Sequence, residues 1–280
     1  FPDEDSCLSY LSEQKFAEGF VCSKCGHTHY CQGNRKYDRQ CTRCRHSESP
    51  TNNTLFHKVK FPLLKAFYIV YYVSTNKKGI SSTELSRKLG LRQKTCWLFK
   101  QKVMKAMKSS GTHLMTGKVE VDETVVGGEE EGVRGRKNES KKLVVIAIEK
   151  RGKGVSRMYA KVIERSSSKE LGGFMEEVIS KEAEIKTDEW TAYKPLAKYF
   201  PNIKHVPSGK KGENFPELHR TIMGFKGWLR GMHHQVKHLQ AYLDEYSYRF
   251  NRNQIKEGLF ENLVLRMVKS PPMPYKNIMI

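Results

Sequence analysis

Four cysteines near the N-terminus have the spacing of a metal-binding site. Cys22 and Cys25 form one C-x-x-C pair, and Cys41 and Cys44 form a second pair after fifteen intervening residues. The two-residue spacer lets each pair bind one ion, and four thiolates complete a tetrahedral zinc site. Gly26 follows the first pair, where a turn with positive φ is often needed. We predict a structural zinc ribbon, whose metal supplies much of the folding energy of so small a segment.

The other cysteines do not indicate a disulfide framework. The sequence has seven cysteines, an odd number, and contains no secretory h-region, so we do not expect disulfides. A redox C-x-x-C motif is the rival interpretation of the ribbon, but it predicts a single pair near a βαβ pattern. His27, His29 and Cys31 are alternative zinc ligands, and Cys96 is expected to be a core thiol.

Two carboxylates far apart in the sequence are candidates for a second kind of metal site. Val119-Glu120-Val121-Asp122 alternates apolar and polar residues, which predicts a strand. Asp188 ends another predicted strand, 66 residues later. Carboxylates on adjacent strands can hold Mg²⁺ or Mn²⁺, and two such ions can promote attack on a phosphodiester. Taken individually, each aspartate is better explained as the cap of a strand.

The elements around these aspartates suggest how the two would meet. Periodicity predicts three strands, a helix and a fourth strand, over 119–122, 143–149, 157–164, 168–184 and 185–188. This order suits a ribonuclease H-like fold of mixed α/β class, in which the first and fourth strands are neighbours. Asp122 and Asp188 would then lie together. A charged loop is expected over 129–140.

Two predicted C-terminal helices carry further polar groups. The helix over 217–230 has an apolar stripe, and an adjacent stripe places His219 and Lys226 on one face. The helix over 236–250 and the residues after it carry an acid and two bases along one side, at Glu245, Arg249 and Arg252. The acid and the first arginine form a surface salt bridge in one interpretation, and in the other the arginines contact phosphates.

The middle of the chain predicts a helix-turn-helix. Helices are expected over 61–74, 84–89 and 92–107, with a turn at Gly90 between the last two. The last helix is led by groups that would enter the major groove of DNA, namely Arg92, Gln93, Lys94 and Lys100. Its inward face is expected to carry Trp97, Val103 and Met107. An ordinary pair of packed helices is the alternative.

Charge and composition are consistent with a nucleic-acid partner. The net charge is +20, with 12 basic residues and one acid in residues 61–118 and 15 basic against 6 acidic residues in 194–280. Hydrophobic residues make up 38% of the chain, which excludes a collagen-like or wholly disordered protein. No apolar run approaches 18 residues, so no membrane span is expected.

In combination, these motifs resemble the DDE transposases of bacterial insertion sequences that carry an N-terminal zinc ribbon, a group related to the Merlin elements. The resemblance covers nearly all of residues 1–252. It rests on the order and spacing of the four cysteines, Lys78-Gly79-Ile80-Ser81, Val119 to Thr124 with Gly127-Gly128, Thr187 to Tyr193, Lys226 to His234, and His238 to Arg252.

The resemblance implies a DNA transposase that binds the terminal inverted repeats of its element, as a dimer or a higher assembly. It would cut the element ends by hydrolysis and join the exposed 3′-OH to target DNA. By carry-over, Asp122 and Asp188 bind Mg²⁺ or Mn²⁺, and Lys226 contacts DNA. The family's glutamate-arginine-arginine signature corresponds to Glu245, Arg249 and Arg252. A cytoplasmic, nucleoid-associated bacterial protein with structural zinc is expected.

The third metal ligand departs from the pattern of the family. Many relatives have Glu seven residues before the lysine, where this chain has His219, and others have Asn two residues before it, where this chain has Gly224. An imidazole binds Mn²⁺ and, more weakly, Mg²⁺. We rank His219 first, Glu217 second and a two-ligand site completed by water third, and we expect a preference for Mn²⁺.

Other functions remain alternatives at this stage. The chain could be a domesticated DNA-binding protein with a silent catalytic domain, a ribonuclease H-type nuclease that cuts without joining, or a basic zinc protein that binds RNA. The expected domains are a zinc ribbon over 1–58, a helix-turn-helix domain over 59–117, a catalytic domain over 118–252 and a C-terminal tail over 253–280. Within this last segment, Leu259, Leu263 and Met267 indicate a short helix.

Overall fold

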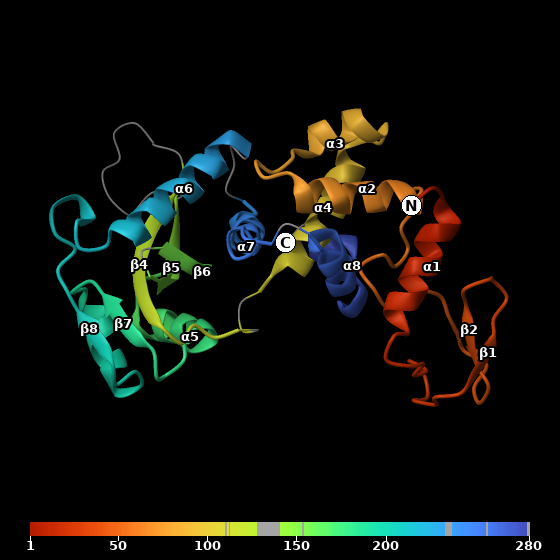
Figure 1. Cartoon of the computed structure of the whole chain (residues 1–280), viewed down its shortest axis with the longest axis horizontal. Helices are drawn as coiled ribbons and strands as arrows, with labels where there is room; N and C mark the ends of the chain where they lie inside the picture. The colour runs from red at the N-terminus through yellow and green to blue at the C-terminus, as the bar shows by residue number, and fades with distance from the viewer. Residues whose placement is uncertain are drawn as a thin grey trace. The chain divides into compact units, whose positions relative to one another are not determined.

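The computed structural model consists of two compact units (Figure 1). It describes residues 1–109, 111, 113–127, 141–152, 154–232, 237–255 and 257–278. The first unit combines residues 1–107 with 255–280, and the second comprises residues 108–254. The predicted loop over 129–140 and the His233-His234 pair lie outside the described residues.

The first unit begins with a helix and a small sheet. Helix α1 (Glu4–Lys15) starts with a capping box, in which the Asp3 carboxylate accepts from the Ser6 amide at 2.8 Å. An antiparallel sheet follows, with the strand order β1 (Tyr30–Gln32), β2 (Arg39–Cys41) and β3 (Ser47–Glu48). Phe16 and Phe20 pack against the buried Cys22 and Cys41, so a small core lies beside the cysteine pairs.

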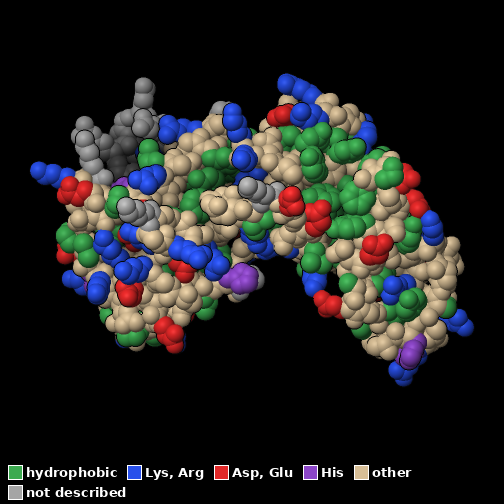
Figure 2. Space-filling model, viewed as in Figure 1, with side chains coloured by type: hydrophobic (Ala, Val, Ile, Leu, Met, Phe, Trp, Pro, Cys, Tyr) green, Lys and Arg blue, Asp and Glu red, His purple; other side chains and the backbone are tan. Residues whose placement is uncertain are grey.

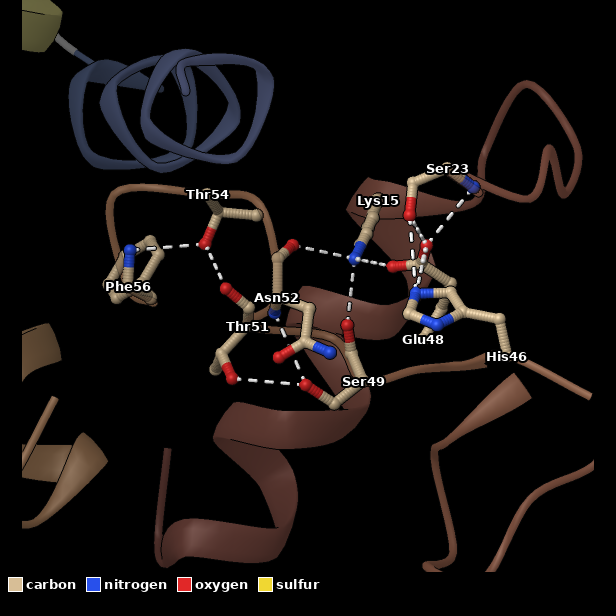
Figure 3. A network of polar contacts seen from close by, with 9 residues as sticks. All are labelled: Lys15, Ser23, His46, Glu48, Ser49, Thr51, Asn52, Thr54 and Phe56. Atoms are coloured by element: carbon tan, nitrogen blue, oxygen red, sulfur yellow. Dashed lines mark hydrogen bonds and ion pairs between the residues drawn. The ribbon is translucent and has the colours of Figure 1, made fainter. Parts of the chain in front are cut away.

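A polar network ties α1 to this sheet and to the loop after it (Figure 3). The Lys15 ammonium donates to the carbonyls of Ser49 and Asn52, at 2.8 and 2.7 Å, and pairs with Glu48 at 3.5 Å. Glu48 is 2% exposed and also accepts from the amide and hydroxyl of Ser23. Burial opposes ionisation of Glu48, but the bonds from Ser23 and the charge of Lys15 outweigh it and lower its pKa.

Three helices of the first unit form the helix-turn-helix region. They are α2 (Leu63–Thr75), α3 (Ser82–Leu89) and α4 (Gln93–Met107), close to the predicted ranges. The Ser81 hydroxyl caps α3 by accepting from the Glu84 amide, and Gly90 ends the helix with φ 60°. The carboxylate of Glu4 accepts from the first two amides of α2, both at 2.9 Å, because Pro62 provides no side-chain cap.

The inward face of α4 differs in part from the prediction. Val103 and Met107 are fully buried, as expected, but Trp97 is only half-buried. The adjacent Cys96 is fully buried instead, which confirms it as a core thiol. Successive side chains on a helix point about 100° apart, so Cys96 faces the core while Trp97 is turned partly towards solvent.

The last described helix returns to the first unit. Helix α8 (Leu259–Lys269) contacts α1, α2 and α4, and its apolar face is buried, with Leu263, Val264 and Met267 fully inaccessible. The Leu55 amide donates to the Met267 carbonyl at 3.1 Å. The short helix predicted from Leu259, Leu263 and Met267 is therefore confirmed, and it completes a core of the first unit.

The second unit is built on a five-stranded mixed sheet. Its strand order is β6-β5-β4-β7-β8. These strands are β4 (Lys118–Val126), β5 (Lys142–Arg151), β6 (Gly154–Ile163), β7 (Glu184–Thr187) and β8 (Ile203–His205). The first three pair as an antiparallel meander, while β7 runs parallel to both β4 and β8. This topology confirms the expected ribonuclease H-like fold.

Helices cover both faces of the sheet (Figure 1). Helix α5 (Ser168–Val178) packs on the apolar side chains of one face, among them Val119, Val121, Val145 and Ala147. Helix α5 ends six residues before the predicted end, because Ile179 becomes extended and pairs with Met115. Helix α6 (Pro216–Met232) contacts β4 and β5, and α7 (Leu239–Phe250) contacts β6.

Polar side chains around α7 protect the free edge of β6. Asn251 accepts from the Met158 amide at 2.7 Å and donates to its carbonyl at 2.9 Å. Gln240 accepts from the Val162 amide and donates to the Ala160 carbonyl. These amide groups occupy the positions of a missing neighbouring strand, and so they cover an edge that would otherwise be open to pairing.

Candidate metal sites and nucleic-acid interface

The four predicted cysteines meet at one point. Their sulfur atoms all lie within 4.8 Å of one another, with Cys22 and Cys44 3.5 Å apart and Cys25 and Cys41 3.6 Å apart. Sulfurs bound to one tetrahedral zinc at about 2.3 Å would be about 3.8 Å apart, so the quartet fits the ion. In the described part of the chain, this is the only group of three or more metal-binding side chains this close together.

The two halves of the ribbon have the same backbone geometry. The Cys22 and Cys41 amides each donate to the carbonyl five residues later, both at 2.9 Å. Each turn closes on a residue in the left-handed region, Gly26 with φ 71° and Arg45 with φ 59°. The turn predicted at Gly26 is confirmed, and its counterpart uses a residue that pays a steric cost for this conformation.

The alternative zinc ligands are engaged elsewhere. The Cys31 sulfur lies 3.7 Å from the Gln40 carbonyl, and the His27 ring lies 3.2 Å from the Thr42 hydroxyl. His29 packs against the ring of His27. The described contacts therefore favour the four cysteines as the complete ligand set.

The parallel pairing of β4 and β7 brings the two aspartates to the same end of these neighbouring strands. Val121 is the register partner of Thr187, so Asp122 and Asp188 follow at equivalent positions of neighbouring strands. The Asp122 carboxylate accepts from the Glu123 amide at 2.7 Å, and the Asp188 carboxylate accepts from the Trp190 amide at 3.1 Å. The expected strand ends one residue early, at Thr187, so Asp188 is the first residue beyond it.

A buried tyrosine supports this end of the strands from the other face of the sheet. The Tyr193 hydroxyl donates to the Glu123 carboxylate at 2.6 Å. Burial raises the pKa of Tyr193 well above its usual value, and the negative charges of Glu123, Asp122 and Asp188 add to the effect. A phenol that stays protonated can keep donating, so this bond holds β4 against the segment that follows β7.

His219 approaches Asp122 from helix α6. Its Nε2 atom is buried and has no hydrogen-bond partner in the described structure, and it lies 4.0 Å from the Asp122 carboxylate. Ligands of one octahedral ion with bonds of about 2.1 Å are roughly 3 to 4.2 Å apart, so the pair fits a shared metal. Gly212 leaves room for the imidazole, since a Cβ there would lie 2.3 Å from the ring.

Glu217, ranked second as a third ligand, is held by a lysine. The Lys150 ammonium lies 3.0 Å from Glu217 and 3.3 Å from Glu120, which is buried on β4. The bond from Lys150 lowers the pKa of Glu217. Neither Glu120 nor Lys150 is among the predicted site residues. Alternation along β4 does place Glu120 on the same face as Asp122.

The predicted DNA-contacting residues of the second unit differ in their surroundings. Lys226 is half-buried on α6, and its pKa is lowered by burial and by the charge of Arg230. The Arg249 guanidinium binds Glu245 through two nitrogens, at 2.8 and 3.1 Å. Glu245 is fully buried, so the pair is not the surface salt bridge of the first interpretation. Arg252 stacks on the ring of Tyr248 at 4.0 Å.

The helix-turn-helix presents most of its predicted contacts to solvent. Arg92, Gln93 and Lys94 are exposed at the start of α4. Lys100 is wrongly assigned to this surface, because it is 2% exposed and donates to the Ile80 carbonyl at 2.9 Å. Figure 2 shows many further lysine and arginine side chains on the described surface of both units.

Two family models match the chain. A transposase zinc-ribbon domain matches residues 2–47, and an ISXO2-like transposase domain matches residues 114–251. The first match covers the four cysteines, and the second covers the whole sheet with α6 and α7. These matches define a DNA transposase. The chain belongs to the ISXO2-like transposases that carry an N-terminal zinc ribbon, which confirms the resemblance found in the motifs.

Comparisons with individual proteins add little. A search of curated protein sequences found no match. Four chains of solved structures match, among them a pre-cleavage Mos1 transpososome with 10% sequence identity. That match covers 73% of this chain and 78% of the other, with a TM-score of 0.30. The fold assignment rests instead on the strand order and the family match. No described helix is long and apolar enough to cross a membrane.

Proposed function

We propose that this transposase cuts the ends of its own element and joins them to target DNA, using Asp122, Asp188 and His219 to hold the catalytic metal ions. The observation that carries the proposal is the parallel pairing of β4 with β7, because Asp122 on β4 and Asp188 directly after β7 follow register partners. His219 adds an orphaned buried nitrogen 4.0 Å from Asp122.

The donor set fits Mn²⁺ or Mg²⁺. Two carboxylates and one imidazole suit Mn²⁺ well and Mg²⁺ less well, because Mg²⁺ prefers oxygen ligands. When bound, such ions activate an attacking oxygen and stabilise a leaving one in an in-line displacement. The backbone amides of Glu123 and Trp190 orient the two aspartates by donating to them. Among the described residues, Asp188 does not form a close cluster with the other two, so the three side chains would have to move closer together to share ions.

The basic residues would position DNA at this end of the strands. Lys226 lies on α6, seven residues after His219, and no acidic partner for it is present among the described residues. Arg249 and Arg252 keep their charges in fixed places through Glu245 and the Tyr248 ring. A side chain held in this way loses little conformational entropy when it binds a phosphate.

The first unit would recognise the terminal inverted repeats. Arg92 and Lys94 lead α4, which follows the turn at Gly90 as a recognition helix would. The zinc ribbon supplies further exposed basic groups, at Lys24, Arg35, Lys36, Arg43 and Arg45. An element has two ends to cut and to join to target DNA, and one active site at each end suits this task, so we propose a dimer or a higher assembly on DNA.

The decisive experiment uses DNA that spans both flanks of the element, labelled at the 3′ strand ends. Wild type would be compared with Asp188→Asn in Mg²⁺ and in Mn²⁺, with Glu189→Gln as the control, since Glu189 is the exposed acid next to Asp188. We expect cleaved and joined products from wild type and the control, and neither from Asp188→Asn.

Other outcomes of this experiment identify the rival functions. Cleavage without joined product would indicate a nuclease, and specific binding with no product in either metal would indicate a silent DNA-binding protein. Products that persist in Asp188→Asn would refute the proposed site.

A further inference from the structure

A polar cluster lies under the start of helix α6, beside the proposed metal site. The buried Glu120 of β4 is flanked in the sheet by β5 and β7. Lys150 of β5 bonds Glu120 at 3.3 Å and reaches across to Glu217 of α6 at 3.0 Å. Lys186 of β7 is the register partner of Glu120 and donates to the Asn214 carbonyl, just before α6.

The cluster fixes the first residues of α6 and the two residues before it, a few positions N-terminal to His219. Lys186 also stacks on the buried ring of Phe215, with its ammonium 4.5 Å from the ring centre. The Phe215 carbonyl accepts from the His219 amide at 3.0 Å, so a backbone hydrogen bond of the first helical turn links Phe215 to His219. Lys150 of β5 and Lys186 of β7 therefore contact residues that lie two to five positions before His219.

From this geometry we infer that Lys150, Glu120, Glu217 and Lys186 form a clamp whose role is to position His219 for the metal. The inference rests on the proposed function, since it takes His219 as a ligand. Glu217 serves in the clamp as a partner of Lys150, and so it is withheld from the ion. Lys150 and Glu217 are positioning residues, which act through α6 and do not touch DNA or metal.

An alternative role for this cluster makes the opposite prediction. If Glu217 were itself a ligand, Lys150 would compete with the ion for its carboxylate. Removing the lysine charge would then strengthen metal binding. Under the clamp, the same change frees the start of α6 and weakens metal binding. Partners that orient a ligand typically contribute about 10- to 100-fold to metal affinity.

The test measures Mn²⁺ binding by full-length, zinc-loaded protein, using the electron paramagnetic resonance signal of free Mn²⁺. The variants are Lys150→Gln, Glu217→Gln and the conservative Lys150→Arg. Glu217→Gln leaves the contact between Lys150 and Glu120 in place, and so it is the safer change for folding. Lys161→Gln is the matched control. Lys161 is an exposed lysine of β6 that forms a similar ion pair, with Glu177.

We expect Lys150→Gln and Glu217→Gln to raise the half-saturating Mn²⁺ concentration by roughly 10-fold, and Lys150→Arg and Lys161→Gln by less than about 3-fold. Hydrogen exchange in the metal-free protein should become faster over residues 214–222 and stay unchanged in β4 and β5. This second readout separates loss of position from general unfolding.

Three results would overturn the inference. One is Mn²⁺ binding by Lys150→Gln that equals or exceeds that of wild type. The second is faster exchange throughout the sheet, which would indicate loss of the fold. The third is wild-type binding no stronger than that of Asp122→Asn, which would also refute the proposed metal site. Wild-type binding that depends on Asp122 but not on Lys150 would refute the clamp alone.

Discussion

At the scale of single residues, the unusual feature of the proposed site is its imidazole. His219 stands where the resemblance implies an acid, and its buried Nε2 faces Asp122 with no other partner in the described structure. A neutral imidazole lowers the negative charge of the ligand set by one. The ion would therefore be held less strongly by charge and more by the softer donor, which favours Mn²⁺ over Mg²⁺.

This difference leads to a prediction about metal preference. His219→Ala should lower strand cleavage in Mn²⁺ by on the order of 100-fold, because losing a ligand costs at least as much as losing an orienting partner. His219→Glu should restore the carboxylate and move the preference towards Mg²⁺. Cleavage rates would be measured across titrations of both metals. Equal activity of wild type and His219→Ala in Mn²⁺ would remove His219 from the site.

The left-handed residues of the ribbon permit a reciprocal test. Arg45 has φ 59° and Gly26 has φ 71° at equivalent turns, and nothing lies within 4 Å of a Cβ placed on Gly26. Arg45→Gly should therefore stabilise its turn by about 1 kcal/mol, less a few tenths for the added flexibility of the unfolded chain. Gly26→Ala should destabilise its turn by about 1 kcal/mol.

The zinc affinity of Arg45→Gly and of Gly26→Ala would be measured by competition with a chelator. Wild-type protein at the same concentration is the reference. Shifts of the same sign for the two variants would contradict the equivalence of the two turns.

At the scale of elements, the zinc ribbon depends on its metal more than on its core. Three short strands surround the cysteines, and the apolar cluster there adds only two buried side chains, Phe16 and Phe20, to the buried ligands Cys22 and Cys41. Cys44→Ser should abolish zinc binding and unfold β1 to β3, while Cys31→Ser should keep one zinc per chain, because Cys31 lies against Gln40. Elemental analysis and circular dichroism would test this. Zinc loss in Cys31→Ser would contradict the assigned ligand set.

The proposed role of α4 in DNA recognition makes a separate prediction about salt dependence. Arg92 and Lys94 are exposed at the start of α4. The double change Arg92→Ala with Lys94→Ala should reduce the slope of log affinity against log salt by about 2, since each phosphate contact contributes about 0.9. Lys181→Ala is the control, because Lys181 is exposed beyond α5. An unchanged slope would place the DNA surface elsewhere.

Most elements could be predicted from sequence, because their signals are local. Alternation and apolar runs predict β4, β5 and β6, and two short helical stretches joined by a turn at Gly90 predict the helix-turn-helix. Strand β8 escaped prediction because it has only three residues. The end of α5 was misjudged because Ile179 leaves the helix to pair with Met115, which no local pattern records.

Interactions between distant residues were the harder part of the site. The aspartates could be paired by knowing the fold, but Glu120 and Lys150 were not recognised, since a charged residue within a strand reads as a solvent-facing one. Lys100 of helix α4 was placed on the surface because a lysine on a basic helix is usually exposed, although it donates to a buried carbonyl. The cap that Glu4 provides to α2 joins residues 59 positions apart.

At the scale of the whole molecule, the two units should respond to different metals. The cysteine quartet lies in the first unit, and Asp122, Asp188 and His219 lie in the second. Calorimetry should therefore show two unfolding transitions, since proteins of two units often depart from two-state behaviour. A zinc chelator should lower one, and excess Mn²⁺ should raise the other, because a ligand stabilises only the unit that binds it.

The control for this prediction is Asp122→Asn, in which Mn²⁺ should no longer raise the second transition. A single transition that shifts with either metal would mean that the two units unfold together.

Helix α8 has a consequence for the order of events at the ribosome. The first unit needs this helix, because Leu263, Val264 and Met267 fill its core, yet α8 is synthesised after the whole second unit. A nascent chain therefore carries the unit proposed to cut DNA before the helices proposed to recognise DNA have their complete support. We expect high affinity for DNA only after α8 has left the ribosome and packed into the first unit. Translation stopped ahead of residue 259 would release fragments that cannot compete with the finished enzyme for its DNA.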